Sequence, residues 1–332
     1  MKKIVELPLV DPIYSTYPHQ AIGCAIGYTN PSIRNWYLNE RMNLKCDTKF
    51  CFGYTTPFIR IDRARWRENP HLQKRTFYLE FLKGHTNAVI RELLDRDYYV
   101  AFNGIDDYYV EGKCWYKEKH IGHDGMICGY DQEAKTFSIH GYDSRWIYRV
   151  FKTPQKAFDD GRRSMYERGE FGTICGLKPT LEYVPLEPER ICVNLREYLD
   201  SSFEKYPVVE DKDVFGIVVQ DYIAMYVDKL FDGSIPYERM DRRLFRLIWE
   251  HKKAMLERLS KAEEALQLDP ELSAAYAKLV PEANAIRMLY ASHNMKRRDE
   301  VLPTISKKLL WIKDVELDIL HAFVEKAESA MK

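Results

Sequence analysis

Short apolar runs are the dominant pattern in the first two-thirds of the chain, and residues that favour turns bound each of them. Their length and their aromatic or β-branched content favour strands. These runs are residues 98–102, 125–130, 137–139 and 181–185. Between the earlier runs, apolar residues from Phe77 to Leu94 suggest helices that break near Gly84. This part of the chain is therefore expected to mix helices and strands.

After about residue 195 the pattern changes to helical periodicity. Apolar residues between Leu244 and Leu259 recur at spacings of three and four, as they do on one face of a helix, and residues 304–330 are again amphipathic. Asp269 and Pro270 mark the end of one helix and the start of the next. We expect an α+β fold, with a mixed domain at 1–195 and a helical domain at 196–332 that covers or flanks the active site.

Residues 123–143 form a candidate β-hairpin with a histidine at one open end and a carboxylate at the other. If its polar turn centres near Glu133, His123 faces Asp143. Facing residues of an antiparallel ladder point to the same side, with Cβ atoms about 4.5–5.5 Å apart. Asp143 would then orient the imidazole of His123 as a general base. A slip of one residue would separate the two side chains, and a solvated polar hairpin is the alternative.

Cys24 is the candidate nucleophile, about a hundred residues before the hairpin. A cysteine at a helix N-terminus has its thiolate stabilised by unpaired N–H groups and by the helix dipole. This requires a helix to begin at Cys24, which Gly27 and the pair at 30–31 weaken. A buried structural cysteine is the alternative. Cys46 and Cys51 are other possible nucleophiles that we interpret as structural.

Other side chains compete for or complete this site. Gln20 and the backbone N–H of Cys24 are candidate oxyanion donors. His120 and His140 compete with His123 as the base. His120 and His123 also have the spacing of two metal ligands, but a third ligand at a known spacing is missing, so we expect no metal site.

Composition and charge narrow the class of protein. The chain has 332 residues, of which 45% are hydrophobic and 30% charged, which is typical of a globular fold. Lys and Arg balance Asp and Glu at 50 each, which argues against nucleic-acid binding through bulk charge. No run approaches a membrane span or a signal peptide. Seven irregularly spaced cysteines favour reduced thiols and a cytoplasmic location.

The order of cysteine, histidine and aspartate resembles the papain-like cysteine peptidase superfamily. Within it, the run from His123 through Gly129–Tyr130–Asp131 to Asp143 is similar to the butirosin biosynthesis protein H type of acyltransferase, and residues 240–253 resemble the C-terminal half of that group. The resemblance implies a papain-like domain, of the kind found in C39 peptidases, with an antiparallel sheet and an N-terminal nucleophile helix. It also implies Cys24 as nucleophile, His123 as base and Asp143 as orienter.

The activity that this resemblance implies is amide synthesis in antibiotic biosynthesis. The cysteine takes an acyl group from the phosphopantetheine thioester of a peptidyl or acyl carrier protein, and an amine or diamine then attacks the acyl-enzyme. The protein needs no cofactor of its own. A cysteine peptidase or thioester hydrolase with the same triad is the first alternative, because the triad does not choose the acceptor. A non-enzymatic interaction protein on a degenerate papain-like fold is the second.

Two charged segments are candidate substrate contacts. Asp106 and Asp107 lie beside Tyr108 and Tyr109, where they could hold a cationic amine, but an exposed turn is the favoured interpretation. A basic stretch is interleaved with apolar residues and, under the family resemblance, could contact an acidic carrier protein or the phosphate of its arm. A solvated surface is the alternative. This stretch consists of Arg60, Arg63, Arg65, Arg67, Lys74 and Arg75.

Overall fold

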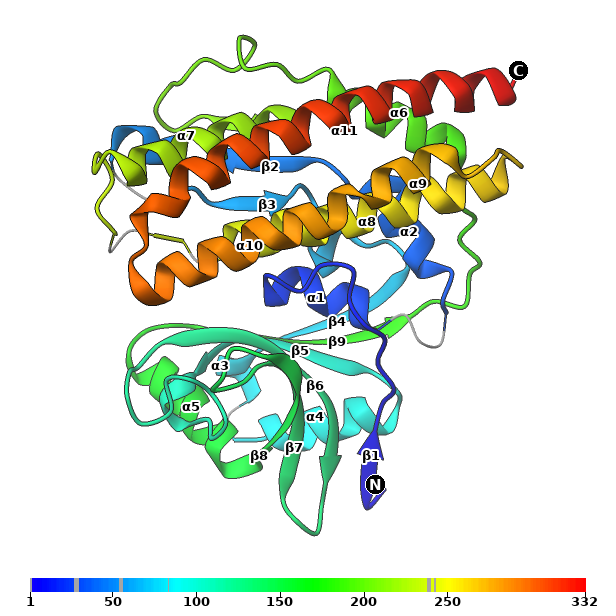
Figure 1. The fold of residues 1–332 in the computed structure, drawn as a ribbon. Coiled ribbons are helices and arrows are strands. Elements are labelled where there is room, and N and C mark those ends of the chain that lie inside the picture. Colours follow the sequence, from blue (N-terminus) through cyan, green and yellow to red (C-terminus); the bar gives the residue numbers. More distant parts are fainter. Residues whose placement is uncertain (1, 27–29, 54–55, 83, 238–239, 242) are drawn as a thin grey trace. The chain divides into compact units, whose positions relative to one another are not determined.

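Two compact units make up the chain, and each is built from two separate segments. A computed structural model describes residues 2–26, 30–53, 56–82, 84–237, 240–241 and 243–332. Unit 1 comprises Met1–Ile33 and Arg65–Tyr183, and unit 2 comprises Arg34–Ala64 and Val184–Lys332. The expected α+β class, with an antiparallel sheet and a helical C-terminal region, is confirmed (Figure 1).

Residues 34–64 belong with the C-terminal helices, and this differs from the expected single boundary at residue 195. The cause is a three-stranded sheet in unit 2. Its central strand β2 (Leu44–Asp47) pairs antiparallel with β3 (Ile59–Ile61) and with β10 (Asp213–Phe215). The pairing of β2 with β10 joins segments about 170 residues apart, so no local pattern in the sequence indicates it.

Unit 1 is built on a seven-stranded sheet whose pairings are all antiparallel. Six strands follow one another across the sheet, and β1 (Ile4–Glu6) pairs with the far end of β6. The six are, in spatial order, β4 (Leu72–Tyr78), β9 (Thr173–Pro179), β5 (Tyr99–Asp106), β6 (Gly122–Asp131), β7 (Thr136–Tyr142) and β8 (Tyr148–Pro154).

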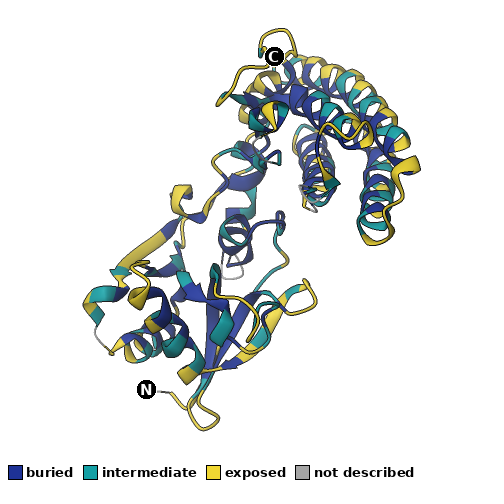
Figure 2. Ribbon diagram, turned by 90° about the vertical axis from the view of Figure 1, so that its left-hand side faces the viewer, coloured by how far each residue is buried: buried dark blue, intermediate teal, exposed yellow. Residues whose placement is uncertain are grey.

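The core of unit 1 lies between this sheet and two amphipathic helices, α4 (Thr86–Asp95) and α5 (Gln155–Glu167). Ile90 and Leu94 of α4 and Phe158 of α5 pack in one cluster with Ile127 and Ile139 of the sheet. Figure 2 shows these central strands as largely buried. The short α3 (Leu79–Leu82) follows β4 directly.

The β6–β7 hairpin has the expected register over part of its length. Met126 faces His140 and Ile127 faces Ile139, as a turn centred near Glu133 requires. An irregularity at Cys128 shifts the remaining pairs by one residue. The ladder with β7 ends at Met126, so the His123 end of β6 pairs only with β5, where His123 faces Ile105.

Unit 2 is largely helical, and its helices pack through the faces that the sequence periodicity predicts. Leu244, Leu247, Ile248, Met255 and Leu259 of α8 are all buried. Arg242, inside the passage 240–253 quoted for the family resemblance, lies outside the described residues. The helices are α2 (Ile33–Glu40), α6 (Pro188–Leu199), α7 (Val219–Phe231), α8 (Leu244–Ala265), α9 (Glu271–Ala277), α10 (Leu279–Lys296) and α11 (Leu302–Ala330).

Short 3-10 turns in this unit are η2 (Lys49–Phe52), η5 (Gly216–Val218) and η7 (Asp299–Val301). Within the described residues, none of the helices has both the length and the apolar content that crossing a bilayer requires.

A fully buried carboxylate, Glu316 of α11, connects the helices of unit 2. It pairs with Lys252 of α8, which is also fully buried, and accepts hydrogen bonds from Tyr276 (2.5 Å) and Gln220 (2.8 Å). Burial alone would raise the pKa of Glu316, but the charge of Lys252 and the hydrogen bonds from Lys252 and Tyr276 outweigh it, so the pKa is lowered. The carboxylate is therefore ionised inside the helical core. With Tyr198 of α6, which also donates to it (3.2 Å), its partners come from four other helices.

We predict that Lys252→Met destabilises the protein by about 3–5 kcal/mol, because it leaves the charge of Glu316 buried and unpaired. Lys308→Met is the matched control, since Lys308 is a partly exposed lysine paired with Glu282, and its loss costs about 1 kcal/mol or less. Urea titration of both variants measures the difference. Equal losses of stability would contradict the account.

Candidate functional site

Cys24 lies at the wrong end of its helix for the expected thiolate. It is the seventh of eight residues of α1 (Pro18–Ala25) and is buried. Pro18 occupies the first turn, where its missing N–H costs nothing, so His19 and Gln20 lie at the N-terminal end. The carbonyl groups of a last helical turn carry partial negative charge, which opposes a thiolate. The expectation that the helix begins at Cys24 is therefore wrong.

His123 is held by a carboxylate other than the expected one. Its Nδ1 lies 2.5 Å from Oδ2 of Asp107, which belongs to η4 (Asp107–Tyr109), directly after β5. Asp143 accepts hydrogen bonds from the backbone N–H groups of Arg145 (2.8 Å) and Ile147 (2.9 Å). The expected pairing of His123 with Asp143 is wrong, because β7 ends at Tyr142 and Asp143 instead closes a turn.

The side chain of His123 also points away from the helix that carries Cys24. Successive residues of a strand point to opposite faces of the sheet, so His123 and Asp124 lie on opposite faces. Asp124 lines a pocket together with His19 and Ile22 of α1. The α1 face of the sheet therefore holds Asp124, and His123 lies on the other face.

The histidine on the α1 face is His140, which the sequence offered as a competitor. It faces Met126, two residues from Asp124, and its ring lies 4.5 Å from that of Tyr148. Burial lowers the pKa of His140 to about 4, so its imidazole is neutral at physiological pH. Burial raises the pKa of Tyr148, and the nearby Cys24 adds to that rise. Cys24 and His140 thus border the same buried aromatic region.

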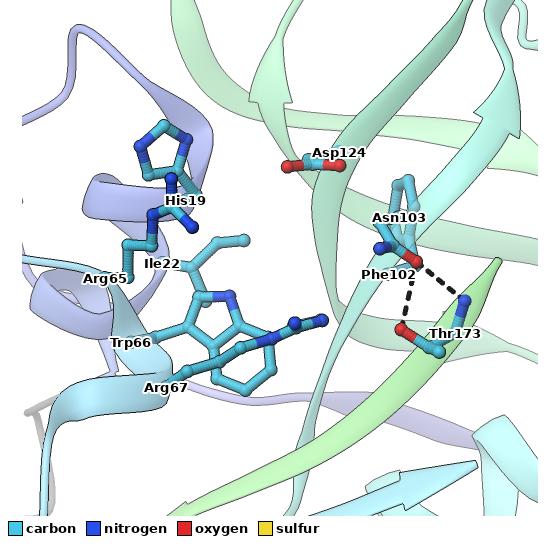
Figure 3. Close-up of a pocket in the computed structure, with 10 residues that line it drawn as sticks. His19, Ile22, Arg65, Trp66, Arg67, Phe102, Asn103, Asp124 and Thr173 are labelled. Atoms are coloured by element: carbon cyan, nitrogen blue, oxygen red, sulfur yellow. Dashed lines mark hydrogen bonds between the residues drawn. The ribbon is translucent and has the colours of Figure 1, made fainter. Parts of the chain in front are cut away.

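The pocket itself has a volume of about 230 Å³ and is formed within unit 1 (Figure 3). Three of its residues come from η3 (Trp66–Glu68) and the residue before it: Arg65, Trp66 and Arg67. Opposite them lie Asp124 of β6 and Asn103 of β5, as Figure 3 shows. The pocket thus combines two cationic side chains with one carboxyl group and one amide.

Asn103 presents hydrogen-bond donors to this pocket. Its side-chain oxygen accepts from both the backbone N–H (2.6 Å) and the hydroxyl (3.0 Å) of Thr173. These bonds fix the orientation of the amide, and its NH₂ group donates to no other described residue. Since the amide lines the pocket, the NH₂ group is available to a ligand there.

Asp124 is the group in this pocket that titrates unusually. Burial raises the pKa of its carboxyl group, and the neighbouring groups His123, Arg67, Lys113 and Arg65 offset only part of that rise. The folded protein therefore favours the protonated form of Asp124 more than the unfolded chain does.

Asp106 and Asp107 do not have the accessible carboxylates that were expected to bind an amine. They are 0% and 2% exposed. Oδ2 of Asp106 lies 2.7 Å from Nδ1 of His120 and accepts from the hydroxyl of Ser164 at 2.6 Å. Burial alone would raise the pKa of Asp106, but the hydrogen bonds from Ser164 and His120 outweigh it, and the pKa is lowered. Each carboxylate therefore orients one partly exposed histidine.

Gln20, the expected oxyanion donor, is buried in α1 one turn before Cys24. Its role stays a prediction, as does that of Cys24 as nucleophile. Within the described ranges, no three histidine, cysteine or acidic side chains are grouped as a metal site requires.

Comparison with known proteins adds no family to these observations. No protein-family model and no curated protein matches the sequence. The resemblance to butirosin biosynthesis protein H therefore rests on the residues quoted for it, and each function drawn from it is a proposal.

Sequence reasoning missed Asp107 as the partner of His123, and it missed the pocket around Asp124. The proximity of Asp107 to His123 depends on the 15 residues that connect them, which have no periodic pattern. The position of Asp124 could have been predicted, because it is adjacent to His123 in a strand and must therefore point to the opposite face of the sheet.

We predict that Asp124→Asn stabilises the protein at neutral pH. The pKa of the Asp124 carboxyl group is higher in the folded protein than in the unfolded chain. Its contribution to the free energy of unfolding is therefore fully present below the unfolded pKa of about 3.9, and it is lost as the pH rises through the folded pKa. The gain in melting temperature should therefore shrink as the pH falls toward 3.5. Melting curves of Asp124→Asn and of the unchanged protein between pH 3.5 and 8 measure this gain. A difference in melting temperature that does not change with pH would contradict the raised pKa.

Proposed function

We propose that unit 1 binds a ligand with an anionic group in the pocket beside α1. The observation that carries this proposal is the pair of guanidinium groups of Arg65 and Arg67, which line the pocket and donate to no described side chain or carbonyl. Guanidinium groups bind phosphate and carboxylate through paired hydrogen bonds. The amide NH₂ of Asn103 supplies a further donor.

The carboxyl group of Asp124 adds a second requirement. It lies in the same pocket as the two arginines and accepts hydrogen bonds from a ligand that carries an amide N–H or a hydroxyl. Trp66 offers an indole wall beside these groups. A ligand with a phosphate and several amide or hydroxyl groups meets both requirements. The phosphopantetheine arm of a carrier protein, which the family resemblance implies, is a ligand of this class.

A degenerate papain-like domain is the form of fold that we propose for unit 1. The order of a short helix with Cys24, followed by an antiparallel sheet with His123, supports it. The separation of these two side chains favours a binding protein over an enzyme. It also argues against a peptidase or thioester hydrolase that uses Cys24, since hydrolysis needs the same triad.

Acyl transfer from a carrier-bound thioester to an amine is the second candidate function. The observation that favours it is the contact of His123 with Asp107, because a buried carboxylate on Nδ1 leaves Nε2 of a partly exposed histidine as a general base. This candidate needs a nucleophile on the His123 face of the sheet, which Cys24 does not provide.

We predict that phosphopantetheine binds at least tenfold more tightly than pantetheine, because the phosphate contacts Arg65 and Arg67. Arg67→Gln should remove most of this difference. Arg63→Gln is the matched control, since Arg63 belongs to the same basic stretch but does not line the pocket. Isothermal titration calorimetry measures each affinity. Equal binding of the two ligands, or an equal effect of the two substitutions, would contradict the proposed site.

The two candidate functions differ in their covalent chemistry. We predict that incubation with an acyl N-acetylcysteamine thioester leaves Cys24 unmodified, because this thiol is buried in a last helical turn. Intact-protein mass followed by peptide mapping tests this. An acyl group on Cys24 would reinstate the cysteine acyltransferase, and an acyl group that moves to an added diamine would establish amide synthesis.

A further inference from the structure

The turn between β7 and β8 presents an exposed tryptophan in an unusual backbone conformation. Trp146 has a φ of 59° and is 54% exposed. In this left-handed region the Cβ atom of an L-residue crowds the backbone, so glycine or asparagine is the usual occupant of such a hairpin position. A large aromatic residue here therefore adds strain to the turn, and the burial of its exposed side chain offsets little of that strain.

Asp143 builds this turn and fixes the position of Trp146. The backbone N–H of Trp146 donates to the carbonyl oxygen of Asp143, and that of Asp143 donates to the carbonyl oxygen of Ile147, both at 3.0 Å. The buried carboxylate of Asp143 accepts from the N–H groups of Arg145 and Ile147 and from Nε of Arg149 (2.5 Å). These five bonds hold the turn in one shape.

Other aromatic and aliphatic side chains surround Trp146. The ring of Trp115 lies 6.3 Å away, edge to face, and that of Tyr142 lies 6.5 Å away. Ile147, which follows Trp146 directly, is exposed. Three exposed cations, Arg145, Arg149 and Lys119, belong to the same segments, and Nζ of Lys119 lies 5.6 Å from the Trp115 ring. We call this set of seven residues the Trp146 surface.

We propose that the Trp146 surface binds a segment of another protein that carries acidic and apolar side chains. Tryptophan, tyrosine and arginine are the residues that dominate the binding energy of protein interfaces. Arg145 and Arg149 both pair with the buried carboxylate of Asp143, so the three cations and this carboxylate together leave two positive charges, which match an acidic partner. The strained turn holds its tryptophan in place before the partner arrives, which lowers the entropy cost of binding.

A protein partner fits this surface better than a nucleic acid. The rings of Trp115 and Trp146 lie at 85° to each other, so they form no parallel platform on which successive bases could stack. The chain as a whole has a formal net charge of zero. Ile147 adds aliphatic surface that an apolar side chain can cover.

Selection from a phage-displayed library of random 16-residue peptides, with the full-length protein as bait, tests this proposal. We expect enriched peptides that combine Asp or Glu with Leu, Phe or Trp. The best synthetic peptide should bind Trp146→Gly and Arg145→Glu at least tenfold more weakly than the unchanged protein. Trp311→Ala is the matched control, since Trp311 of α11 is a similarly exposed tryptophan (48%) in unit 2, outside the Trp146 surface. This variant should bind the peptide as tightly as the unchanged protein does.

Three results would overturn the proposal. One is the absence of enrichment, or enrichment of basic peptides. Another is a selected peptide that binds Trp146→Gly and the unchanged protein equally. The third is tighter binding of oligothymidylate than of any selected peptide, lost in Trp146→Gly, which would assign the surface to nucleic acid.

The melting temperature of Trp146→Gly separates a role in binding from a role in folding. Glycine relieves the strain at this φ, so we expect a melting temperature equal to or above that of the unchanged protein. Lost binding with a stable fold supports the proposal. A clear fall in melting temperature would show that Trp146 serves the fold, and would overturn the argument from strain.

Discussion

The alternation of side chains along β6 is the constraint on which the rest of the site depends. His123 and Asp124 are adjacent in this strand, so one contacts Asp107 and the other faces α1. No rotation of either side chain brings both to one face. The fold therefore separates the histidine that resembles a catalytic base from the helix that carries Cys24, and it leaves an arginine-lined pocket on the α1 face.

Three aspartates that the sequence predicts to be site residues position other groups in the structure. Asp106 and Asp107 each orient a histidine, and Asp143 closes the turn that presents Trp146. Buried carboxylates are costly unless donors or cations satisfy them. Asp106 and Asp143 each accept several hydrogen bonds, and Asp107 contacts Nδ1 of His123 and lies 3.9 Å from Nζ of Lys113. Asp124 differs, because its burial raises its pKa and it faces a pocket. It is therefore the aspartate most suited to contact a ligand.

The sequence predicted what depends on local pattern. The helical face from Leu244 to Leu259 and the register of Met126 with His140 were both readable, because each follows from side-chain period over a few residues. Pro18 also indicates, from the sequence, that α1 begins before Cys24, because proline is favoured in the first turn of a helix.

What the sequence could not predict depends on contacts between distant segments. The pairing of β2 with β10 places residues 34–64 in unit 2, and the irregular connection after β5 brings Asp107 to His123. The predicted pairing of His123 with Asp143 was wrong because the ladder between β6 and β7 ends at Met126, three residues short of His123. A register extrapolated past the end of a ladder carries no information on which side chains meet.

The rate at which iodoacetamide alkylates Cys24 in the native protein, with and without His123→Ala, tests the separation of these two residues most directly. Peptide mass mapping measures it against the partly exposed Cys114 as an internal reference. The structure predicts that Cys24 reacts more slowly than Cys114 and that His123→Ala leaves its rate unchanged. Rapid alkylation of Cys24 that falls at least tenfold in His123→Ala would contradict the account and restore a cysteine–histidine pair.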